Sequence, residues 1–262
     1  MDLNLKQQLL LIFTLLLLSA PGYGQDSYPG VDDVPTGEIA LRQIHPDVWL
    51  HISSWQFDNG MKYPSNGMIV RHGDELFLVD PALGEQATEA LLAAIEEQIG
   101  LPVTFALSTH FHDDRVAGDK QLEEAGIKVY ATALTRRLAS AAGNTVPESV
   151  LSGLDRAGDA VTVGPLEVFF PGAGHSRDNL IVYLPAAGIL FGGCAVHEAR
   201  RDDPGNTADA DIMAWPASLR RIQDRYPQAK IVVPGHGLPG DMSLISHSIN
   251  LLEQFDAGKT KR

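Results

Sequence analysis

Thr109-His110-Phe111-His112-Asp113-Asp114-Arg115 is the stretch of this sequence that constrains the fold and the chemistry most strongly. Two imidazoles lie two residues apart, and a carboxylate follows two residues later. Alternation along the chain can turn all three side chains toward one point. Imidazole and carboxylate together suit a transition metal that supports hydrolysis, most often zinc. Exposed loops also hold H-x-H-x-D strings by chance, so the rest of the chain has to give this motif its weight.

Three more residues of ligand type follow downstream, each in a glycine-rich turn. They are His175 in GAGHS, Cys194 in FGGC and His236 in PGHG. Each has an ordinary explanation when it is considered alone: His175 as a turn residue, and Cys194 as a buried structural thiol. Together with the first motif they place six ligand-type residues in four turns, which indicates a metal centre.

The six residues divide into two sets by charge and softness. Three neutral nitrogen donors form the first set, which consists of His110, His112 and His175. A zinc ion held by three histidines keeps a fourth position open for water. Two negative charges mark the second set, which consists of Asp114, Cys194 and His236. Two metal ions about 3.5–4 Å apart can act on one substrate, so the pattern favours an enzyme over a protein that only stores zinc in a closed site.

Residues beside these motifs are candidates for a supporting role. Arg115 would be costly to bury without a partner, and we expect it to meet Asp80 at the end of a predicted buried strand. Asp113 is either a group that handles protons near the metal or a solvated acid. His197, three residues after Cys194, is a candidate for the wall of the site.

Length, composition and charge fit a single large domain. The chain has 262 residues, of which 44% are hydrophobic, and this is enough to build a sizeable core. The formal net charge of −13 argues against nucleic acid or an anionic membrane as a partner. Cys194 is the only cysteine, so no internal disulfide can form and the residue is either an inert buried thiol or a functional thiolate.

The N-terminus is typical of a secretory signal. Lys6 supplies a positive charge, residues 9–18 are almost entirely Leu, Ile and Phe, and small residues up to Gly24 offer a cleavage site. The alternative is a membrane anchor, but the apolar run is about half of the roughly 20 residues that a spanning helix needs. We therefore expect a signal peptide over residues 1–24, removed on export, and one domain over residues 25–262.

Hydrophobic periodicity predicts an α/β fold of mixed sheets covered by outer helices. Asn59-Gly60 predicts a hairpin between the first two strands. The expected strands are 48–53, 68–70, 76–79, 103–107, 128–131, 160–163, 166–170, 180–184, 189–191 and 231–233, and the expected helices are 85–99, 115–125, 132–142, 215–226 and 244–255. His110, Cys194 and His236 all follow strand ends, where rigid scaffolds present their chemistry.

The order H-x-H-x-D-R, then a single His, a Cys and a last His, resembles the class B metallo-β-lactamases of the first subclass, and among them the Verona-type carbapenemases. The intervals of 63, 19 and 42 residues that separate His112, His175, Cys194 and His236 agree with that group. The resemblance covers essentially the whole chain after the signal segment and implies an αββα sandwich. It also implies two zinc ions, one bound by the three-histidine set and one by Asp114, Cys194 and His236.

The activity that this resemblance implies is hydrolysis of the amide bond of β-lactam antibiotics in the bacterial periplasm. Carbapenems, penicillins and cephalosporins would be substrates, and monobactams poor ones. The enzyme would be a monomer without a stable association with membranes after signal removal. A thioesterase or phosphodiesterase of the same fold is the competing interpretation, but such relatives usually have His in place of Arg115 and Asp in place of Cys194.

The resemblance also assigns roles near the substrate. Arg201, seven residues after Cys194, would bind the substrate carboxylate, with Arg200 beside it as a substitute. His197 stands where many relatives have a Lys for this purpose. Asp114 and Asn206 would be catalytic residues, and Asn206 would also approach the lactam carbonyl. Phe57 and Tyr63 would form an apolar lip of the site. Pro81 and Leu83 depart from the pattern, which predicts Thr and Trp at these positions.

Overall fold

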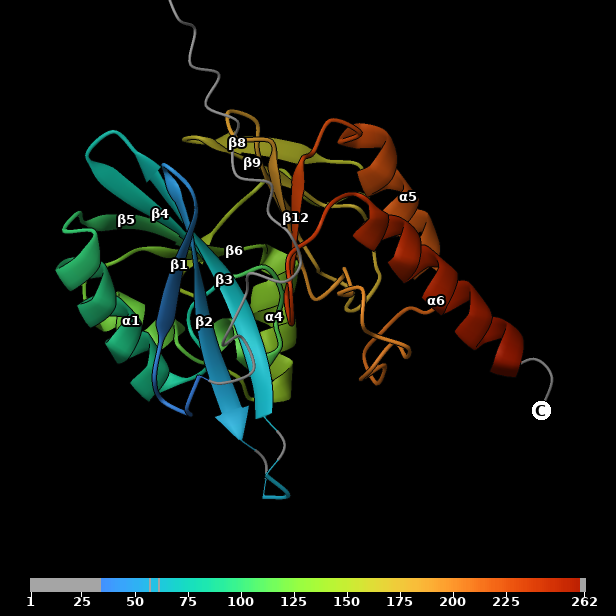
Figure 1. Ribbon diagram of the computed structural model, residues 1–262, viewed down its shortest axis with the longest axis horizontal. Coiled ribbons are helices and arrows are strands. Elements are labelled where there is room, and N and C mark those ends of the chain that lie inside the picture. Colours follow the sequence, from blue (N-terminus) through green and yellow to red (C-terminus); the bar gives the residue numbers. More distant parts are fainter. Residues whose placement is uncertain (1–33, 57, 61, 260–262) are drawn as a thin grey trace, which may run out of the picture.

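The computed structural model describes residues 34–56, 58–60 and 62–259, which form two β-sheets packed face to face (Figure 1). The first sheet has the order β1-β2-β3-β4-β5-β6-β7, and the second has the order β12-β11-β10-β9-β8. The strands of the first sheet are β1 (Ala40–His45), β2 (Val48–Gln56), β3 (Lys62–His72), β4 (Glu75–Val79), β5 (Val103–Leu107), β6 (Val129–Ala131) and β7 (Ser149–Val150). Those of the second are β8 (Ala160–Val163), β9 (Leu166–Phe169), β10 (Ile181–Leu184), β11 (Ile189–Gly193) and β12 (Ile231–Pro234).

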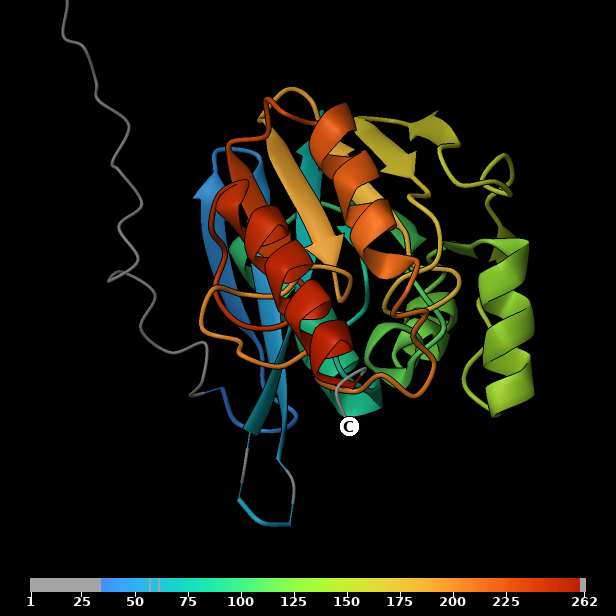
Figure 2. The ribbon, with the colours of Figure 1, turned by 90° about the vertical axis from the view of Figure 1, so that its right-hand side faces the viewer.

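Helices cover the outer face of each sheet, which confirms the expected αββα sandwich. Figure 2 shows α5 and α6 side by side over the second sheet. The helices are α1 (Glu85–Gln98), α2 (Asp113–Val116), α3 (Asp119–Glu124), α4 (Ala133–Ala142), α5 (Trp215–Arg225) and α6 (Ser243–Lys259). Among the described residues, none of these helices combines the length and the apolar character that crossing a bilayer requires.

Three hydrophobic layers hold the sandwich together. The central layer lies between the sheets, where Leu50, Val70 and Leu107 share one cluster with Val182 and Phe191. The two outer layers pack the helices on the sheets. Their buried members include Leu91 and Ile95 of α1 on the first sheet, and Leu219 and Ile222 of α5 with Ile245 and Leu252 of α6 on the second. Burial of each large apolar side chain contributes about 1.5–3 kcal/mol.

The ends of parallel strands from both sheets meet at one edge of the molecule. Strand β5 pairs in parallel with β4 and β6, and β11 pairs in parallel with β12. Backbone hydrogen bonds join the two sheets at this edge: Asn66 donates to Gly235 O over 2.9 Å, and Leu180 donates to Thr109 O over 2.9 Å. The loops that carry the candidate ligands therefore start from a fixed frame.

The hairpin predicted at Asn59-Gly60 joins β2 to β3 in antiparallel register, with Trp55 opposite Tyr63. Strand β3 begins well before residue 68, where the sequence indicated its start, because the nine-residue β2 offers it a complete ladder. Gly67 is needed in this longer strand, since a Cβ there would lie 2.0 Å from His51 Nε2.

The single helix expected over residues 115–125 is wrong. The chain forms two short helices, α2 and α3, that are separated at Ala117 and Gly118. Gly118 packs so closely on α1 that a Cβ would lie 2.0 Å from Thr88 Oγ1 and 2.9 Å from Ala82 O. The break lets α2 begin directly after the histidine motif, with His112 in extended backbone at its N-cap.

Candidate metal centre

The three histidines of the first set converge on one point. His110 and His112 follow β5, and His175 comes from the loop between β9 and β10 in the other sheet. His112 Nδ1 lies 3.1 Å from His110 Nε2 and 3.1 Å from His175 Nε2. The predicted histidine set is therefore brought together from two sheets.

The second set forms an equally tight cluster beside the first. Asp114 is in α2, Cys194 follows β11 and His236 follows β12. His236 Nε2 lies 3.0 Å from Asp114 Oδ2 and 3.2 Å from Cys194 Sγ, and the sulfur lies 3.4 Å from the same carboxylate oxygen. Three groups of candidate ligands are compact enough to hold a metal ion, because within each group the ligand atoms lie within 4.8 Å of one another. The groups are His110–His112–Asp114, His110–His175–Cys194 and Asp114–Cys194–His236.

Partners behind two of the rings decide which nitrogen faces the centre. His236 Nδ1 lies 2.7 Å from Pro64 O, and a carbonyl oxygen can only accept, so Nδ1 carries the hydrogen. In the neutral ring Nε2 then directs a lone pair at the Asp114 carboxylate. On the other side, His112 Nε2 lies 3.1 Å from Asp209 Oδ2, which leaves Nδ1 as the inward lone pair. Imidazole nitrogens, a carboxylate and a thiol gathered at such distances are the donors that zinc prefers, so the donor set fits zinc.

A fully buried arginine contacts the second set. Arg115 donates to Asn66 O over 2.6 Å, to Gly235 O over 2.9 Å and to Cys194 Sγ over 3.0 Å. It also pairs with Asp80 at 3.3 Å, which confirms the expected contact, and with Asp114 at 3.1 Å.

Gly235 makes the close approach of this arginine to Cys194 possible. A Cβ at Gly235 would lie 2.7 Å from both Cys194 N and Cys194 Sγ, and 2.8 Å from Arg115 Nη2. A larger residue would therefore push apart a backbone atom, a candidate ligand and the guanidinium that supports it.

The electrostatics of the cluster keep His110 and His175 neutral. Burial, followed by the neighbouring imidazoles, lowers the pKa of His110 well below its usual range and that of His175 to about 3. Burial alone would raise the pKa of Asp114, but Arg115 and His236 outweigh it and hold that pKa well below the ordinary value. Burial raises the pKa of the Cys194 thiol in the protein alone, so binding of a metal there displaces a proton.

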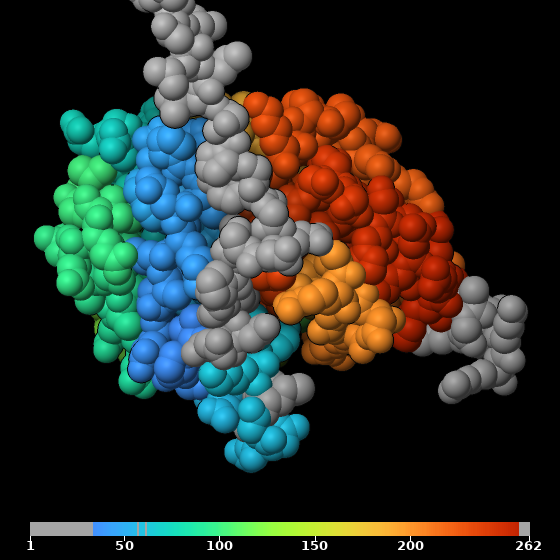
Figure 3. Space-filling view, in the orientation of Figure 1, coloured from blue at the N-terminus to red at the C-terminus, as the bar shows by residue number. Residues whose placement is uncertain are grey.

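A cavity of about 790 Å³ opens above the cluster. In Figure 3 the loop that follows β11, in orange, lies at the surface between the β2–β3 hairpin, in cyan, and α6, in red. Among the residues that line the cavity are the predicted substrate residues Tyr63, His197, Arg201 and Asn206, and the candidate ligands His112, Asp114, His175, Cys194 and His236. Phe57, the other residue expected at the lip, lies outside the described residues.

Arg201 and Arg200, the two arginines expected near the substrate, have different surroundings in the loop after β11. Arg201 lines the cavity and is held by Asp203, whose Oδ1 lies 2.7 Å from Nη2. Arg200 pairs with Glu198 at 3.0 Å and is not among the residues that line the cavity. Asp113 is exposed at the cavity rim, so both of its proposed roles stay open.

His197 is buried and stacks on Trp215, with ring centroids 5.2 Å apart. Burial lowers its pKa to about 4. The ring is therefore neutral near pH 7 and does not supply the positive charge that a lysine would bring to this position.

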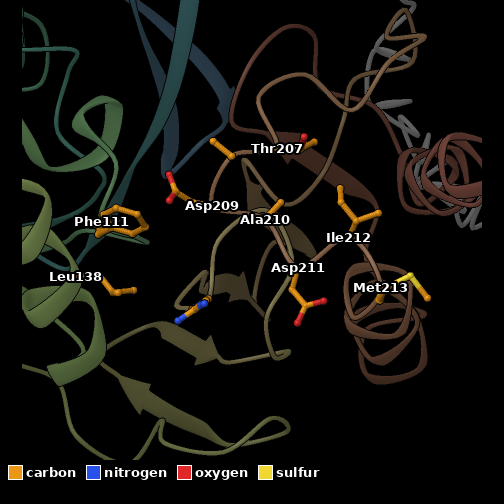
Figure 4. A pocket seen from close by; sticks show the side chains of 10 residues that line it. Phe111, Leu138, Thr207, Asp209, Ala210, Asp211, Ile212 and Met213 are labelled. Carbon is orange, nitrogen blue, oxygen red and sulfur yellow. The ribbon is translucent and has the colours of Figure 1, made fainter. Parts of the chain in front are cut away.

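Two residues of the site had no signal of ligand type in the sequence. Trp55, of which 51% is exposed, lines the main cavity. Asp209 belongs to residues 207–213, which also line a second cavity of about 600 Å³ together with Phe111, Leu138 and Arg177 (Figure 4). Asp209 contacts the candidate ligand His112, 97 residues away in the chain, and its segment TADAD has the composition of an ordinary acidic loop.

Comparisons with known proteins agree with this geometry. Residues 60–236 match the metallo-beta-lactamase superfamily. The chain is 38% identical over 220 residues to metallo-beta-lactamase type 2 of Bacillus cereus, covering 83% of this chain and 84% of that protein. It is 33% identical over 228 residues to the type 2 enzyme of Bacteroides fragilis, covering 86% and 89%.

Solved structures give the same result. A metallo-beta-lactamase from Pontibacter korlensis superposes with a TM-score of 0.76 at 38% identity, over 82% of this chain and 99% of that one. FIM-1 from Pseudomonas aeruginosa, in its mono-zinc form, superposes with a TM-score of 0.79 at 34% identity, over 83% and 96%.

An αββα sandwich with this cluster of His, Asp and Cys at one edge defines a zinc hydrolase. The chain belongs to the metallo-β-lactamases of class B, and within that class to the type 2 enzymes, which form the first subclass.

Proposed function

We propose that the protein hydrolyses the amide bond of β-lactam antibiotics with two zinc ions. His110, His112 and His175 would hold one ion, and Asp114, Cys194 and His236 the other. The observation that carries the proposal is the convergence of both sets, within hydrogen-bond distances, at the floor of a cavity whose rim holds Arg201. When bound there, zinc polarises a carbonyl group and lowers the pKa of water.

The residues of the chain bind and orient the substrate around this chemistry. Arg201 faces the cavity and takes the substrate carboxylate. Asn206 Oδ1 accepts from Ala208 N over 3.1 Å, which leaves its NH2 group to donate to the lactam carbonyl oxygen. Asp114, kept anionic by Arg115, accepts a hydrogen bond from the attacking water and so fixes its direction.

The substrate range and cellular location belong to the same proposal. Carbapenems, penicillins and cephalosporins are the proposed substrates, with monobactams poor ones. Arg201 and the neutral His197, at their positions after Cys194, support a Verona-type enzyme. Residues 1–24, which lie outside the described residues, would be removed as a signal peptide and leave a monomeric domain of residues 25–262 in the periplasm.

One assay separates this function from that of a thioesterase of the same fold. The purified protein, loaded with zinc, is given a carbapenem and, separately, a thioester. We expect hydrolysis of the carbapenem, two zinc ions per chain by elemental analysis, and loss of activity after dialysis against a chelator. Thioester cleavage alone, or carbapenem hydrolysis that persists without metal, contradicts the proposal.

The variant Cys194→Ala tests the division into two sets. It removes the only soft ligand of the second set, so we expect that set to lose its metal while the three histidines keep theirs. The turnover number should fall more than tenfold, and the fold should survive because the large core does not depend on this side chain. Metal content, kcat and circular dichroism measure the three effects, and full activity with two metals would show that Cys194 is only a structural residue.

A further inference from the structure

Helix α6 holds the backbone around Arg201 in place. His247 of α6 donates from Nε2 to Arg201 O over 2.9 Å, because a carbonyl oxygen can only accept. In the same loop, His197 N donates to the hydroxyl oxygen of Ser248, also in α6, over 2.8 Å. With the main chain fixed in this way, the direction of the Arg201 guanidinium depends on what its own nitrogens contact.

Asp203 contacts one edge of that guanidinium with two oxygens. Its side-chain Oδ1 accepts from Arg201 Nη2 over 2.7 Å, and its backbone O accepts from Arg201 Nε over 3.4 Å. The third nitrogen, Nη1, has no hydrogen-bond partner among the residues that the structure describes. Because the planar guanidinium can bind a carboxylate with two parallel hydrogen bonds, the edge formed by Nη1 and Nη2 is the one left for a ligand.

The carboxylate of Asp203 is itself fixed, because Oδ1 also accepts from Gly205 N over 2.8 Å. Gly205 has a φ of +68°, and a Cβ there would lie 2.5 Å from Arg201 Nη2. One carboxylate oxygen therefore holds both the guanidinium and the turn that leads to Asn206. Arg201, Gly205 and Asn206 line the cavity, but Asp203 does not, so Asp203 holds Arg201 from outside the cavity wall.

We propose that Asp203 is a positioning residue that sets both the direction and the strength with which Arg201 binds a substrate carboxylate. By holding the edge formed by Nε and Nη2, it leaves the edge with Nη1 for the cavity. By adding a negative charge to the same guanidinium, it repels the substrate carboxylate and lowers the affinity for anionic substrates. This inference rests on the proposed function, in which Arg201 takes the substrate carboxylate.

The charge of Asp203 has an effect of limited size. The side chains of Arg201 and Asp203 are 38% and 66% exposed, so water screens the repulsion. In water, the repulsion between two carboxylates on one guanidinium changes the affinity by about two- to fourfold. At about 1 M salt, where the Debye length is about 3 Å, this effect should nearly disappear.

The variant Asp203→Asn removes the charge and keeps an oxygen that can accept from Arg201 and Gly205. For a penicillin at low salt, KM should fall about two- to fourfold. The turnover number kcat should stay unchanged, because the carboxylate contact exists before and during the chemical step. For the methyl ester of the same penicillin, which has no carboxylate for Arg201, KM should not change. Asp203→Ala also removes the side-chain hydrogen bonds, so its KM for the penicillin should exceed that of Asp203→Asn.

Asp202→Asn is the matched control. It removes the same charge from the neighbouring side chain, which is exposed in the same loop and makes no ion pair with Arg201. Its KM should lie closer to that of the wild type than to that of Asp203→Asn. A second measurement needs no turnover: in calorimetry, the hydrolysed penicillin, which keeps the carboxylate, should bind Asp203→Asn more tightly than the wild type.

Several results would overturn the inference. They are a KM of Asp203→Asn that is unchanged or raised, an equal fall for the methyl ester or in Asp202→Asn, a fall that persists at about 1 M salt, a hydrolysed penicillin that binds Asp203→Asn no more tightly, and a KM of Asp203→Ala no higher than that of Asp203→Asn. If the wild type hydrolyses no β-lactam, the proposed function fails as well. Normal hydrolysis with equal KM values in all variants removes only the role of Asp203.

Discussion

Asp209 shows how one residue outside the two sets can determine which nitrogen of the candidate ligand His112 faces the centre of the cluster. Its carboxylate holds the outer nitrogen of His112 at 3.1 Å. Removal of such a partner typically costs 10- to 100-fold in metal affinity.

For Asp209→Asn we expect the lower end of that range, about tenfold weaker binding of the first metal. The amide oxygen can still accept the hydrogen bond but has no charge, and the Asp209 side chain is half exposed. Chelator competition measures the change. Asp211→Asn is the control, because Asp211 lies in the same loop and accepts from Ala214 N rather than from a histidine. Equal affinities of Asp209→Asn and Asp211→Asn for the first metal would contradict this role of Asp209.

Arg201→Ala should weaken substrate binding more than it slows the reaction, because the carboxylate contact exists before and during the chemical step. A charge-assisted hydrogen bond contributes roughly 1.5–3 kcal/mol, and the arginine is 38% exposed, so solvent screening reduces this. We expect KM to rise about tenfold with little change in kcat. Arg200→Ala is the control and should leave KM unchanged, because Arg200 does not line the cavity. Steady-state kinetics on several β-lactams measures KM and kcat for both variants.

At the scale of single residues, the sequence predicts the ligand candidates but not all of the contacts between them and their neighbours. The six ligand candidates could be predicted because each is of a metal-binding type, three of them in the H-x-H-x-D motif after a strand and three in glycine-rich turns. The contact of Tyr63 with His236 spans 173 residues, and nothing in its neighbourhood, KYPSN, indicates a partner so far away. Contacts of this kind depend on how the two sheets dock.

At the level of helices and strands, α3 carries a buried acid that the mechanism does not use. Asp119, the first residue of α3, lies beneath β5, where the Ser108 hydroxyl is 2.9 and 2.8 Å from its two oxygens. Burial, with the charges of Asp80 and Glu123, raises its pKa well above the usual value. An unfolded aspartate has a pKa near 3.9, so the stability that the protonated form contributes is fully present below about pH 3.9 and is lost as the pH rises through the folded value.

Asp119→Asn should remove this loss. The free energy of unfolding of the variant should exceed that of the wild type increasingly between about pH 4.5 and pH 8, by about 1.4 kcal/mol for each unit of pKa shift that lies within the window. Urea unfolding at both pH values measures the difference. Asp74→Asn, in the exposed turn after β3, is the control, and parallel curves for Asp119→Asn and the wild type would contradict the prediction.

The elements themselves divide into those that the sequence indicates and those that it does not. Strands β4, β5 and β12 and helices α1 and α5 have clear periodicity and lie within a few residues of their predicted bounds. The edge strands β1 and β7 were missed, because β7 has only two residues and β1 is largely half-buried. The break between α2 and α3 depends on the packing of Gly118 against Thr88, which local propensity does not contain.

For the molecule as a whole, the candidate ligands of each set come from both sheets, so metal binding should stabilise the folded state. In the proposed function each metal ion joins a loop of the first sheet to loops of the second. A ligand at about 1,000 times its dissociation constant stabilises the folded state by about 4 kcal/mol. For a domain of this size that corresponds to roughly 8–16 °C in Tm.

We therefore expect removal of zinc by a chelator to lower Tm by about that amount and to abolish activity, and added zinc to restore both. Calorimetry on the metal-free and reloaded protein measures the shift. Cys194→Ala, with one metal fewer, should show a smaller shift and serves as the comparison. A Tm that stays constant while the metal is removed would show that the ions do not join the sheets.

The meeting of strand ends from both sheets also bears on how the chain reaches its native state. A partly folded molecule with only the first sheet formed offers His110, His112 and Asp114, and one with only the second offers His175, Cys194 and His236. Neither half contains a complete set, and the contacts that complete one must close long loops. Zinc therefore gives its full binding energy only to the finished fold, which makes the transition between unfolded and native chains more cooperative.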